Sequence, residues 1–431
     1  MRLTEDDKMP LFRQTFEAST LRKFIRRSDF WKKNNFCDDR SELDCVLSQL
    51  CERIWDIHYK IETKFFTNQN QKRVYVINDY DDSIVLRKIA SDIKRIYQLF
   101  PPSRNEIVEQ VISLLKDGSS YSILRTDIKS FFESIPLEKI ISKLSDDGLL
   151  SPKSLSIIKN LYRNEDGTTS FKRGFSTSSI LSELYMRSFD RKIKEIDGVY
   201  YYNRFVDDIV IFTTKDTKHL LTIIATLLGE NLKLNEKKTS ITILPCEKYQ
   251  TKGYYKHKKC NESEQCKYNN KSFNYLGYNF TIPCLPNKDT KEREIEVRLS
   301  KNKLNKYKTR ITKSFLKYAK DRNFDLLIDR ISFLTDNSKI PSERNIGKIM
   351  TGIYYTYPFL SNPDNELCEL DKYLLNCIHC SHNAFNGQIR FTREQLKAIK
   401  KYTFVNGFKK QISHSVTYVK LAQICECWKH A

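Results

Sequence analysis

Two adjacent aspartates, Asp207 and Asp208, separate an aromatic and β-branched run over 200–206 from a second such run over 209–213. This composition predicts two strands joined by a tight turn that carries both acids. Neighbouring carboxylates repel each other, and their burial beside apolar strands is costly or forces protonation unless a cation is present. A solvated turn is the simpler interpretation of an isolated pair, so other residues must decide whether a cation binds here.

A third carboxylate, Asp127, ends the apolar stretch over 121–126 and precedes two aromatic residues and Pro136. Proline often opens a helix, so this pattern places Asp127 at the end of a strand, where the chain turns. Magnesium is a hard ion that binds carboxylates and backbone carbonyls. Two such ions would stabilise both the attacking and the leaving oxygen of an in-line phosphoryl transfer.

A loop rich in hydroxyls lies between these acids along the chain. Gly174 precedes Ser176 to Ser179, four consecutive hydroxyl residues, and an apolar periodic run follows. Such a pattern predicts a loop that opens a helix. Helix capping explains one or two of the hydroxyls, and a glycine-hydroxyl loop can also approach a sugar-phosphate backbone closely.

Local patterns predict the elements that position these residues. Residues 1–60 show helical periodicity, and 73–77 is a short strand candidate. Helices are expected over 83–100 and 103–115, separated by two prolines. Their basic residues include Arg87 and Arg104, which could together bind a triphosphate, with solvated helix faces as the alternative. A further helix is expected over 220–228, and a strand pair with the central Gly277 over 273–280.

The composition narrows the class of partner. The chain has 431 residues, enough for roughly two or three structural units. Lys and Arg number 74 against 53 Asp and Glu, a net charge of +21 that favours nucleic acid over a small neutral substrate. No signal peptide or membrane-spanning apolar run is found, so we expect a soluble cytoplasmic protein with no membrane partner. The twelve irregularly spaced cysteines are expected to be reduced thiols.

The chain becomes strongly basic from residue 291 onward. Lysines alternate with apolar residues over 301–317, which predicts an amphipathic helix with a cationic flank, although a solvated helix is the alternative. Further helices are expected over 324–334, 346–357, 367–380 and 390–410. Three groups of Cys and His are too irregular in spacing to predict a zinc site. These groups are Cys246, His257, Cys260 and Cys266; Cys377, Cys380 and His382; and Cys425, Cys427 and His430.

Five segments, taken in order, resemble the palm motifs of reverse transcriptases. They are Asp127-Ile-Lys-Ser-Phe-Phe132, Gly174-Phe-Ser-Thr-Ser-Ser179, Phe205-Val-Asp-Asp208, Leu234-Asn-Glu-Lys-Lys-Thr239 and Phe273-Asn-Tyr-Leu-Gly-Tyr278. The resemblance covers about residues 80–280. It departs from the usual pattern at Arg173, where the family often has Gln, at Ser176 and Ser179, where prolines are common, and at Phe205, where many relatives have Tyr.

The resemblance implies roles for individual residues. Asp127, Asp207 and Asp208 would hold two magnesium ions, or manganese as a substitute, with the backbone carbonyl of Ile128 as an extra ligand. Lys238 would protonate the leaving pyrophosphate, although Lys237 is close to it and a surface lysine is the alternative. An incoming deoxynucleotide would contact Ile128, Phe131, Phe132, Arg87, Arg104, Gly174 and Ser176. Nucleic acid would contact Arg173, Phe205, Gly277, Lys301, Lys306 and Lys313.

Phe132 would lie under the sugar and exclude a 2′-hydroxyl, with core packing as the alternative for both Phe131 and Phe132. The implied fold is α+β, a right-hand polymerase with a helical extension (1–60), fingers and palm (61–285) and a basic α-helical thumb (286–431). The residues of these motifs and of the 352–358 segment are most similar to those of bacterial defence-associated reverse transcriptases.

The expected reaction is RNA-directed DNA synthesis from a 3′-hydroxyl, in anti-phage defence, on a noncoding RNA template. Two other functions stay open: a template-independent or protein-primed nucleotidyl transferase, and a non-catalytic RNA-binding subunit of a defence complex. The expected partners are the RNA template, the DNA product and dNTPs, and a second copy or a companion defence protein stays open.

Overall fold

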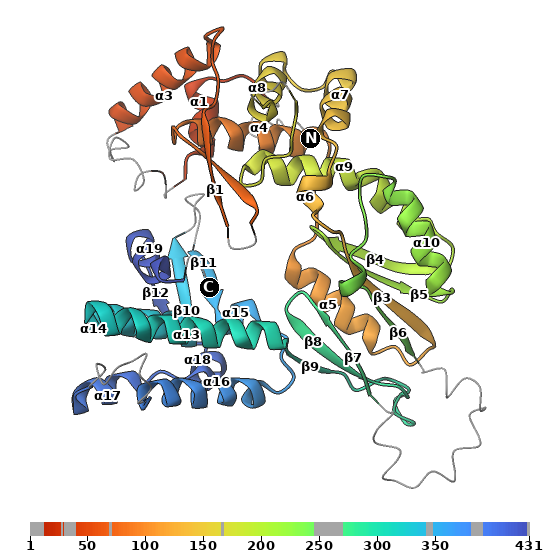
Figure 1. Ribbon diagram of the computed structural model, residues 1–431, viewed down its shortest axis with the longest axis vertical. Helices are drawn as coiled ribbons and strands as arrows, with labels where there is room; N and C mark the ends of the chain where they lie inside the picture. The colour runs from red at the N-terminus through yellow and green to blue at the C-terminus, as the bar shows by residue number, and fades with distance from the viewer. Residues whose placement is uncertain are drawn as a thin grey trace, which may run out of the picture. The chain divides into compact units, whose positions relative to one another are not determined.

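A computed structural model describes residues 13–26, 29, 40–68, 71–164, 168–244, 270–341, 348–380 and 391–428 (Figure 1). The chain forms two compact units. The first comprises Met1–Pro101, Ser130–Ser188 and Glu230–Leu232, and the second comprises Pro102–Lys129, Phe189–Gly229 and Lys233–Ala431. Each unit is therefore built from segments that are distant in sequence. The expected three-domain division at residues 60 and 285 remains a prediction.

The first unit is mostly helical and carries one β-hairpin. Its elements are α1 (Ala18–Leu21), η2 (Arg22–Phe24), α3 (Arg40–Trp55), β1 (Thr63–Thr67), β2 (Arg73–Ile77), α4 (Asp82–Ile96), α6 (Phe131–Ser134), α7 (Leu137–Asp147), α8 (Pro152–Tyr162) and most of α9 (Ser176–Lys194). β1 and β2 pair antiparallel. The strand over 73–77 and the helix from residue 83 are confirmed, although α4 ends at Ile96, four residues earlier than expected.

The second unit is organised around a four-stranded antiparallel sheet. Its strands β4 (Val199–Phe205), β5 (Asp208–Thr213), β3 (Tyr121–Asp127) and β6 (Ser240–Leu244) lie in the order β4-β5-β3-β6. Figure 1 shows α5 (Arg104–Leu115) and α10 (Thr217–Leu228) on opposite sides of this sheet. β5 is buried throughout after its first residue, as expected for a strand covered on both faces.

Two smaller sheets and several helices complete the second unit. After η3 (Glu236–Lys238), one sheet pairs β7 (Asn270–Tyr275), β8 (Tyr278–Pro283) and β9 (Glu296–Leu299). The rest of the chain forms α13 (Lys301–Asp321), α14 (Phe324–Thr335), β10 (Asn337–Pro341), β11 (Lys348–Gly352), α15 (Ile353–Thr356), α16 (Pro363–Ile378), α17 (Arg393–Ile399), α18 (Phe404–Lys409), β12 (Ser413–Ser415) and α19 (Tyr418–Glu426). One continuous hydrophobic core joins α5, β3, the β7-β8-β9 sheet and these helices.

The carboxy-terminal region is not wholly helical, contrary to expectation. The predicted helix over 346–357 is wrong for 348–352, which forms β11 and pairs antiparallel with β10, while β12 adds to β10 in parallel. Residues Ile353–Thr356 of that range are helical, as α15. Gly352 ends β11 at φ +125°, where a side-chain Cβ would lie 2.4 Å from the Asn337 Cα. Glycine is the residue that tolerates such a backbone. The expected helix over 390–410 divides into α17 and α18.

Some sequence features fall outside this description. Phe30 and Trp31 of the expected amino-terminal helix, and Cys246, His257, Cys260, Cys266, His382 and His430 of the irregular Cys and His groups, lie outside the described residues. Within the described ranges, no helix has both the length and the apolar character needed to cross a membrane.

Candidate active site

The turn between β4 and β5 carries the two adjacent aspartates. Phe205 pairs with Asp208, which leaves Val206 and Asp207 as the two turn residues. Val206 has φ +60°, a conformation that costs a β-branched residue about 1–3 kcal/mol. The buried Arg204 guanidinium donates to the Val206 carbonyl at 2.8 Å and holds both carboxylate oxygens of Asp190, at 2.9 and 2.7 Å. Arg204 therefore anchors the strained turn to α9.

Asp127 ends β3 directly beside this turn. It pairs with Asp208 across the sheet, and the N–H of Ile128 donates to the Asp207 carbonyl at 3.1 Å. On the other side, the Asn235 backbone and side-chain N–H groups donate to the Asp127 carbonyl (2.7 Å) and to its Oδ1 (3.1 Å). The Lys238 Nζ lies 2.7 Å from Asp127 Oδ2. The strand end is thus fixed between the turn and η3, as the sequence predicted for Asp127.

The three carboxylates raise the electrostatic cost of the site. Burial raises the pKa of Asp207, and the nearby charges of Asp127 and Asp208 raise it further. Arg125 offsets part of this charge, because its guanidinium lies 2.5 Å from Asp208 Oδ1 and also donates to the Lys238 carbonyl at 3.0 Å. Asp127 and Asp208 are therefore each paired with a cation of the chain itself.

The donor set fits a divalent ion, although the side chains do not converge on one point. Within the described ranges, no group of three His, Cys, Asp or Glu side chains is arranged to hold a metal. Lys238 and Arg125 contact two of the three carboxylates instead. Carboxylate oxygens are still the ligands that magnesium prefers, and burial together with the charges of Asp127 and Asp208 raises the pKa of Asp207, so the three carboxylates lie close enough to interact. A bound metal would either share the Asp127 and Asp208 carboxylates with Lys238 and Arg125 or displace these cations.

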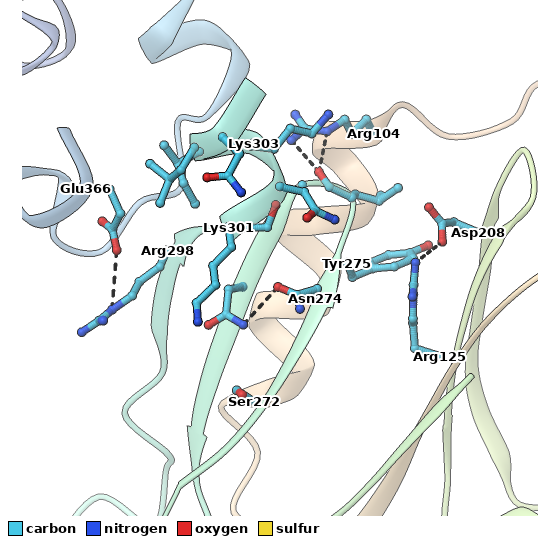
Figure 2. A pocket seen from close by; sticks show the side chains of 18 of the residues that line it. Arg104, Arg125, Asp208, Ser272, Asn274, Tyr275, Arg298, Lys301, Lys303 and Glu366 are labelled. Atoms are coloured by element: carbon cyan, nitrogen blue, oxygen red, sulfur yellow. Dashed lines mark hydrogen bonds and ion pairs between the residues drawn. The ribbon is translucent and has the colours of Figure 1, made fainter. Parts of the chain in front are cut away.

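A large polar cavity of about 1170 Å³ lies beside the turn (Figure 2). Figure 2 shows the Arg125–Asp208 ion pair and the Tyr275 ring on one side, and Lys301 and Lys303 from the start of α13 on another. Phe205 and Gly277 also line this cavity, as do Arg104 and Arg298. The cavity therefore brings together the aspartate-bearing turn between β4 and β5, the turn between β7 and β8, and the start of the basic helix α13.

Gly277 and Arg104 shape the wall of this cavity. Gly277 has φ +86°, and a Cβ there would lie 2.9 Å from the Lys303 Cε. The Arg104 guanidinium donates to the Leu276 carbonyl at 2.9 and 2.7 Å and to the Thr356 carbonyl at 2.7 Å. Arg104 therefore joins the cavity wall at Leu276 to the end of α15 at Thr356 through backbone carbonyls, and the triphosphate contact expected for it remains a prediction.

The first unit holds most of the residues predicted to contact the nucleotide. Phe131 is buried in its core, whereas Phe132 is half-buried, with the Arg173 guanidinium 5.1 Å from its ring centroid. Arg173 also pairs with Glu133 at 3.1 Å. Gly174 has φ +119°, and a Cβ there would lie 2.2 Å from the Tyr75 carbonyl oxygen, so this position needs glycine.

Packing accounts for part of the hydroxyl loop. Ser176 begins α9 and is half-buried, but the next two hydroxyls, Thr177 and Ser178, each lie 2.8 Å from the buried Tyr162 hydroxyl. Arg87 is also committed to internal partners. It pairs with Asp29 at 2.8 Å and donates to the carbonyls of Phe24 and Ser83. A nucleotide contact for Arg87 would have to replace these bonds.

The structure thus brings Asp127, Ile128, Asp207, Asp208 and Lys238 together, with Phe205, Gly277 and Lys301 in the adjoining cavity. Lys306 lines a different cavity, and Lys313 lies further along α13.

Sequence reasoning missed Arg125, Arg204 and Asn235. Arg125 could have been found, since a residue two positions before Asp127 in a strand shares its face. Asn235 lies within the motif segment over 234–239. Its contact with Asp127 depends on an antiparallel β-bridge between Ile128 and Leu234, which no local pattern reveals.

Three acids beside a cavity that also carries Arg and Lys side chains suit phosphoryl transfer on a nucleic acid. The family profile described as reverse transcriptase (RNA-dependent DNA polymerase) matches residues 64–280, about half of the chain. The chain belongs to the reverse transcriptase family. The expectation of an enzyme of this family is therefore confirmed.

Solved structures with similarity to the chain include telomerases from two Candida species. Apo telomerase from Candida tropicalis is 13% identical, with 86% of this chain and 64% of that chain covered and a TM-score of 0.36. Its form truncated from the C-terminal domain is 16% identical, with coverages of 56% and 55% and a TM-score of 0.34. Telomerase from Candida albicans in complex with a TWJ fragment of telomeric RNA is 11% identical, with coverages of 80% and 56% and a TM-score of 0.33. This chain thus spans less than two thirds of the length of each of these three. Comparison with curated proteins found no significant match.

Proposed function

We propose that this protein is an RNA-directed DNA polymerase that adds deoxynucleotides to a 3′-hydroxyl by two-metal phosphoryl transfer. The observation that carries this proposal is the meeting of Asp127, Asp207 and Asp208 at one end of the β4-β5-β3-β6 sheet, beside a cavity lined by both basic and acidic side chains. Membership of the reverse transcriptase family supports the same chemistry.

In the proposed reaction, the 3′-oxygen forms a bond to the α-phosphorus, the bond from that phosphorus to the pyrophosphate oxygen breaks, and the hydroxyl proton leaves to solvent. Magnesium bound by Asp127, Asp207 and Asp208 would supply charge for the attacking and leaving oxygens. Lys238 is 52% exposed and carries a proton at Nζ. Once separated from Asp127, this ammonium can protonate the leaving pyrophosphate.

We assign selection of the sugar to Phe132, with Arg173 on its ring and Gly174 in the adjoining loop. An aromatic ring under the sugar would clash with a 2′-hydroxyl and so favour deoxynucleotides. Phe132→Ala is expected to raise incorporation of ribonucleotides relative to deoxynucleotides, measured as a ratio of kcat/KM values. Phe100→Ala, at an exposed phenylalanine that follows α4, is the control, and an unchanged ratio for Phe132→Ala would remove Phe132 from the site.

The large cavity beside the turn and the basic helix α13 are proposed to hold the template and the growing strand. Lys301 lines the cavity at the start of α13, and Lys306 and Lys313 follow on the same helix. Lysine contacts to phosphates provide affinity without sequence preference. This property suits a surface that must release and rebind a strand after each addition.

The direct test is incorporation of labelled dNTPs on an RNA template with a DNA primer in magnesium buffer. Asp207→Asn is expected to reduce the rate by roughly 10³-fold or more, because a carboxylate acting as part of a catalytic unit is lost. Asp146→Asn, an exposed aspartate of α7, is the matched control and should keep the parental rate. Equal incorporation by Asp207→Asn and the parent would contradict the proposal.

The narrower proposal is a role in bacterial anti-phage defence with a noncoding RNA template, supported by the spelling of the motifs. Phage plating on bacteria that express the parent or Asp207→Asn tests it, and equal protection by both would favour a non-catalytic RNA-binding role.

Sequencing the nucleic acid that copurifies with the protein would identify the template. A product that enters the phenol phase until protease treatment would instead indicate a protein hydroxyl as primer.

A further inference from the structure

Arg125 lies between the hydrophobic core and the three acids on one face of the β4-β5-β3-β6 sheet. Alternate residues of a strand share a face, so Ile123, Arg125 and Asp127 point to the same side of β3. Ile123 belongs to the core, whereas the Arg125 side chain is 18% exposed. Across the sheet, Arg125 faces Val210 in β5 and Ser240 in β6. Its long side chain can therefore reach groups at the ends of both neighbouring strands.

The Arg125 guanidinium connects Asp208 to Lys238. On the β5 side it lies 2.5 Å from Asp208 Oδ1 (Figure 2), and on the β6 side it donates to the Lys238 carbonyl at 3.0 Å. The Lys238 ammonium in turn lies 2.7 Å from Asp127 Oδ2. Each of these two acids therefore has one oxygen in contact with a cation of the chain, and the Arg125 ion pair leaves Asp208 Oδ2 for another ligand.

The two cations offset most of the negative charge of the acids. Asp127, Asp207 and Asp208 carry three negative charges when all are ionised. Lys238 and Arg125 add two positive charges, so the net charge of the five groups is −1. A charge within about 4–6 Å of a carboxylate changes its affinity for a proton by roughly 10- to 1000-fold, and it acts on a divalent ion at least as strongly. The paired cations therefore weaken the binding of a divalent ion.

Arg125 is held more firmly than Lys238. The Lys238 side chain is 52% exposed, and its flexible stem allows the ammonium to move away from Asp127. Arg125 is less exposed and is held on two sides of β3. The ring of Tyr275, a residue that is 1% exposed, lies beside the Arg125–Asp208 ion pair (Figure 2). Of the two cations, Arg125 is thus the one that the fold keeps in place.

We propose that Arg125 is a positioning residue that acts through Asp208: it holds Oδ1, presents Oδ2 to the metal and limits the affinity of the site for a divalent ion. Through the Lys238 carbonyl, the same side chain also fixes η3. The site therefore binds a divalent ion strongly only together with a ligand that brings further negative charge. The role of Arg125 in the reaction rests on the proposed function, whereas its effect on metal affinity does not require catalysis.

The test is the equilibrium binding of Mn²⁺ to the full-length protein without nucleotide or primer, measured by isothermal titration calorimetry. Arg125→Gln keeps a hydrogen-bond donor but removes the charge, so it is expected to bind Mn²⁺ about 10-fold more tightly than the parent, or tighter still. Arg125→Lys keeps the charge and should retain the parental Kd. Arg191→Gln, an exposed arginine of α9, is the matched control and should also retain it. Unchanged or weaker binding by Arg125→Gln would overturn the proposal.

A second variant covers the case in which Arg125→Gln does not fold. Lys238 is half exposed, so Lys238→Gln is expected to fold and, by the same argument from charge, to bind Mn²⁺ more tightly. A parental Kd in Lys238→Gln would contradict that argument. Tighter binding by Arg125→Gln in a protein that incorporates no dNTP would refute the proposed function and leave this inference standing.

Kinetics separate positioning from a merely structural role. One ammonium cannot hold both Asp208 and the Lys238 carbonyl, so Arg125→Lys should lower kcat at saturating Mg²⁺ by roughly 10-fold with little change in Tm. Arg125→Gln should reach its half-maximal rate at a lower Mg²⁺ concentration than the parent. Loss of Tm in both variants, with the parental Mg²⁺ requirement kept, would show that Arg125 only stabilises the fold.

Discussion

Replacement of Arg204 tests whether the strained turn depends on its support from α9. The Arg204 side chain is 3% exposed, and its partner Asp190 is 24% exposed. Arg204→Met removes two bonds to Asp190 and one to the Val206 carbonyl, and it leaves Asp190 with the Tyr202 hydroxyl at 2.5 Å. Arg204→Lys keeps the charge, but a single ammonium cannot make all three bonds.

The expected losses of stability and of kcat follow from these contacts. Breaking a buried ion pair by removing one partner costs about 3–5 kcal/mol. Asp190 is partly solvated and keeps Tyr202, so a loss of about 2–3 kcal/mol in the free energy of unfolding is expected for Arg204→Met. For Arg204→Lys, the lost support of Val206 should lower kcat by roughly 10-fold, which corresponds to about 1.4 kcal/mol. The Kd for primer–template should stay close to the parental value, because Arg204 does not line the cavity.

Steady-state kinetics and thermal unfolding of the two variants measure these effects. Arg191→Met removes an exposed arginine of α9 whose contact with Glu195 is 3.8 Å long, so this variant serves as the control. Parental kcat and Tm in Arg204→Met would refute the view that this side chain holds the turn. An equal loss of primer–template affinity and of kcat would show that it acts on binding instead.

Three other substitutions probe single contacts, each measured by equilibrium unfolding. Gly174→Ala places a Cβ against the Tyr75 carbonyl at positive φ and should destabilise the fold by roughly 2–4 kcal/mol; a parental Tm would contradict that geometry. Lys88→Met leaves the buried Asp92, 2.5 Å away in the parent, without its cation, and should cost about 3–5 kcal/mol at neutral pH. Because burial already raises the pKa of Asp92, this deficit should shrink as pH falls through that pKa, and adding Asp92→Leu should recover most of it. Tyr275→Phe removes a buried hydroxyl that has no hydrogen-bond partner, so stability should be unchanged or slightly higher, and a clear loss would reveal a partner.

Local patterns were sufficient for much of the catalytic sheet. The runs on either side of Asp207 and Asp208 specified a hairpin, and the apolar stretch before Asp127 specified a strand end, because alternation and β-branched residues act over a few neighbouring positions. The helix expected over 103–115 is likewise found as α5, with Ser103 as its N-cap rather than its first residue. The sequence alone therefore places all three acids at strand ends, and their catalytic role remains a proposal.

Interactions between distant segments could not be predicted in this way. The segment over 348–352 became a strand because β10 offers it a partner, and its local residues suit a helix as well as a strand. Arg204 has no sequence signal of its own, since its role depends on Asp190 in another element. The repeated hydroxyls of the 176–179 loop suggested a ligand, but the buried Tyr162 accounts for two of them.

The arrangement of β3 between β5 and β6 also has a consequence for biosynthesis. Asp127 and Lys238, which meet in the finished site, are 111 residues apart in the chain. Contacts of such long range form slowly, because the intervening loop must close before they are made. A nascent chain therefore emerges from the ribosome with its acids dispersed, and Asp127 meets Asp208 only once β3 and β5 have paired. Lys238 joins them only when the segment that leads into β6 has been synthesised and β6 has paired with β3.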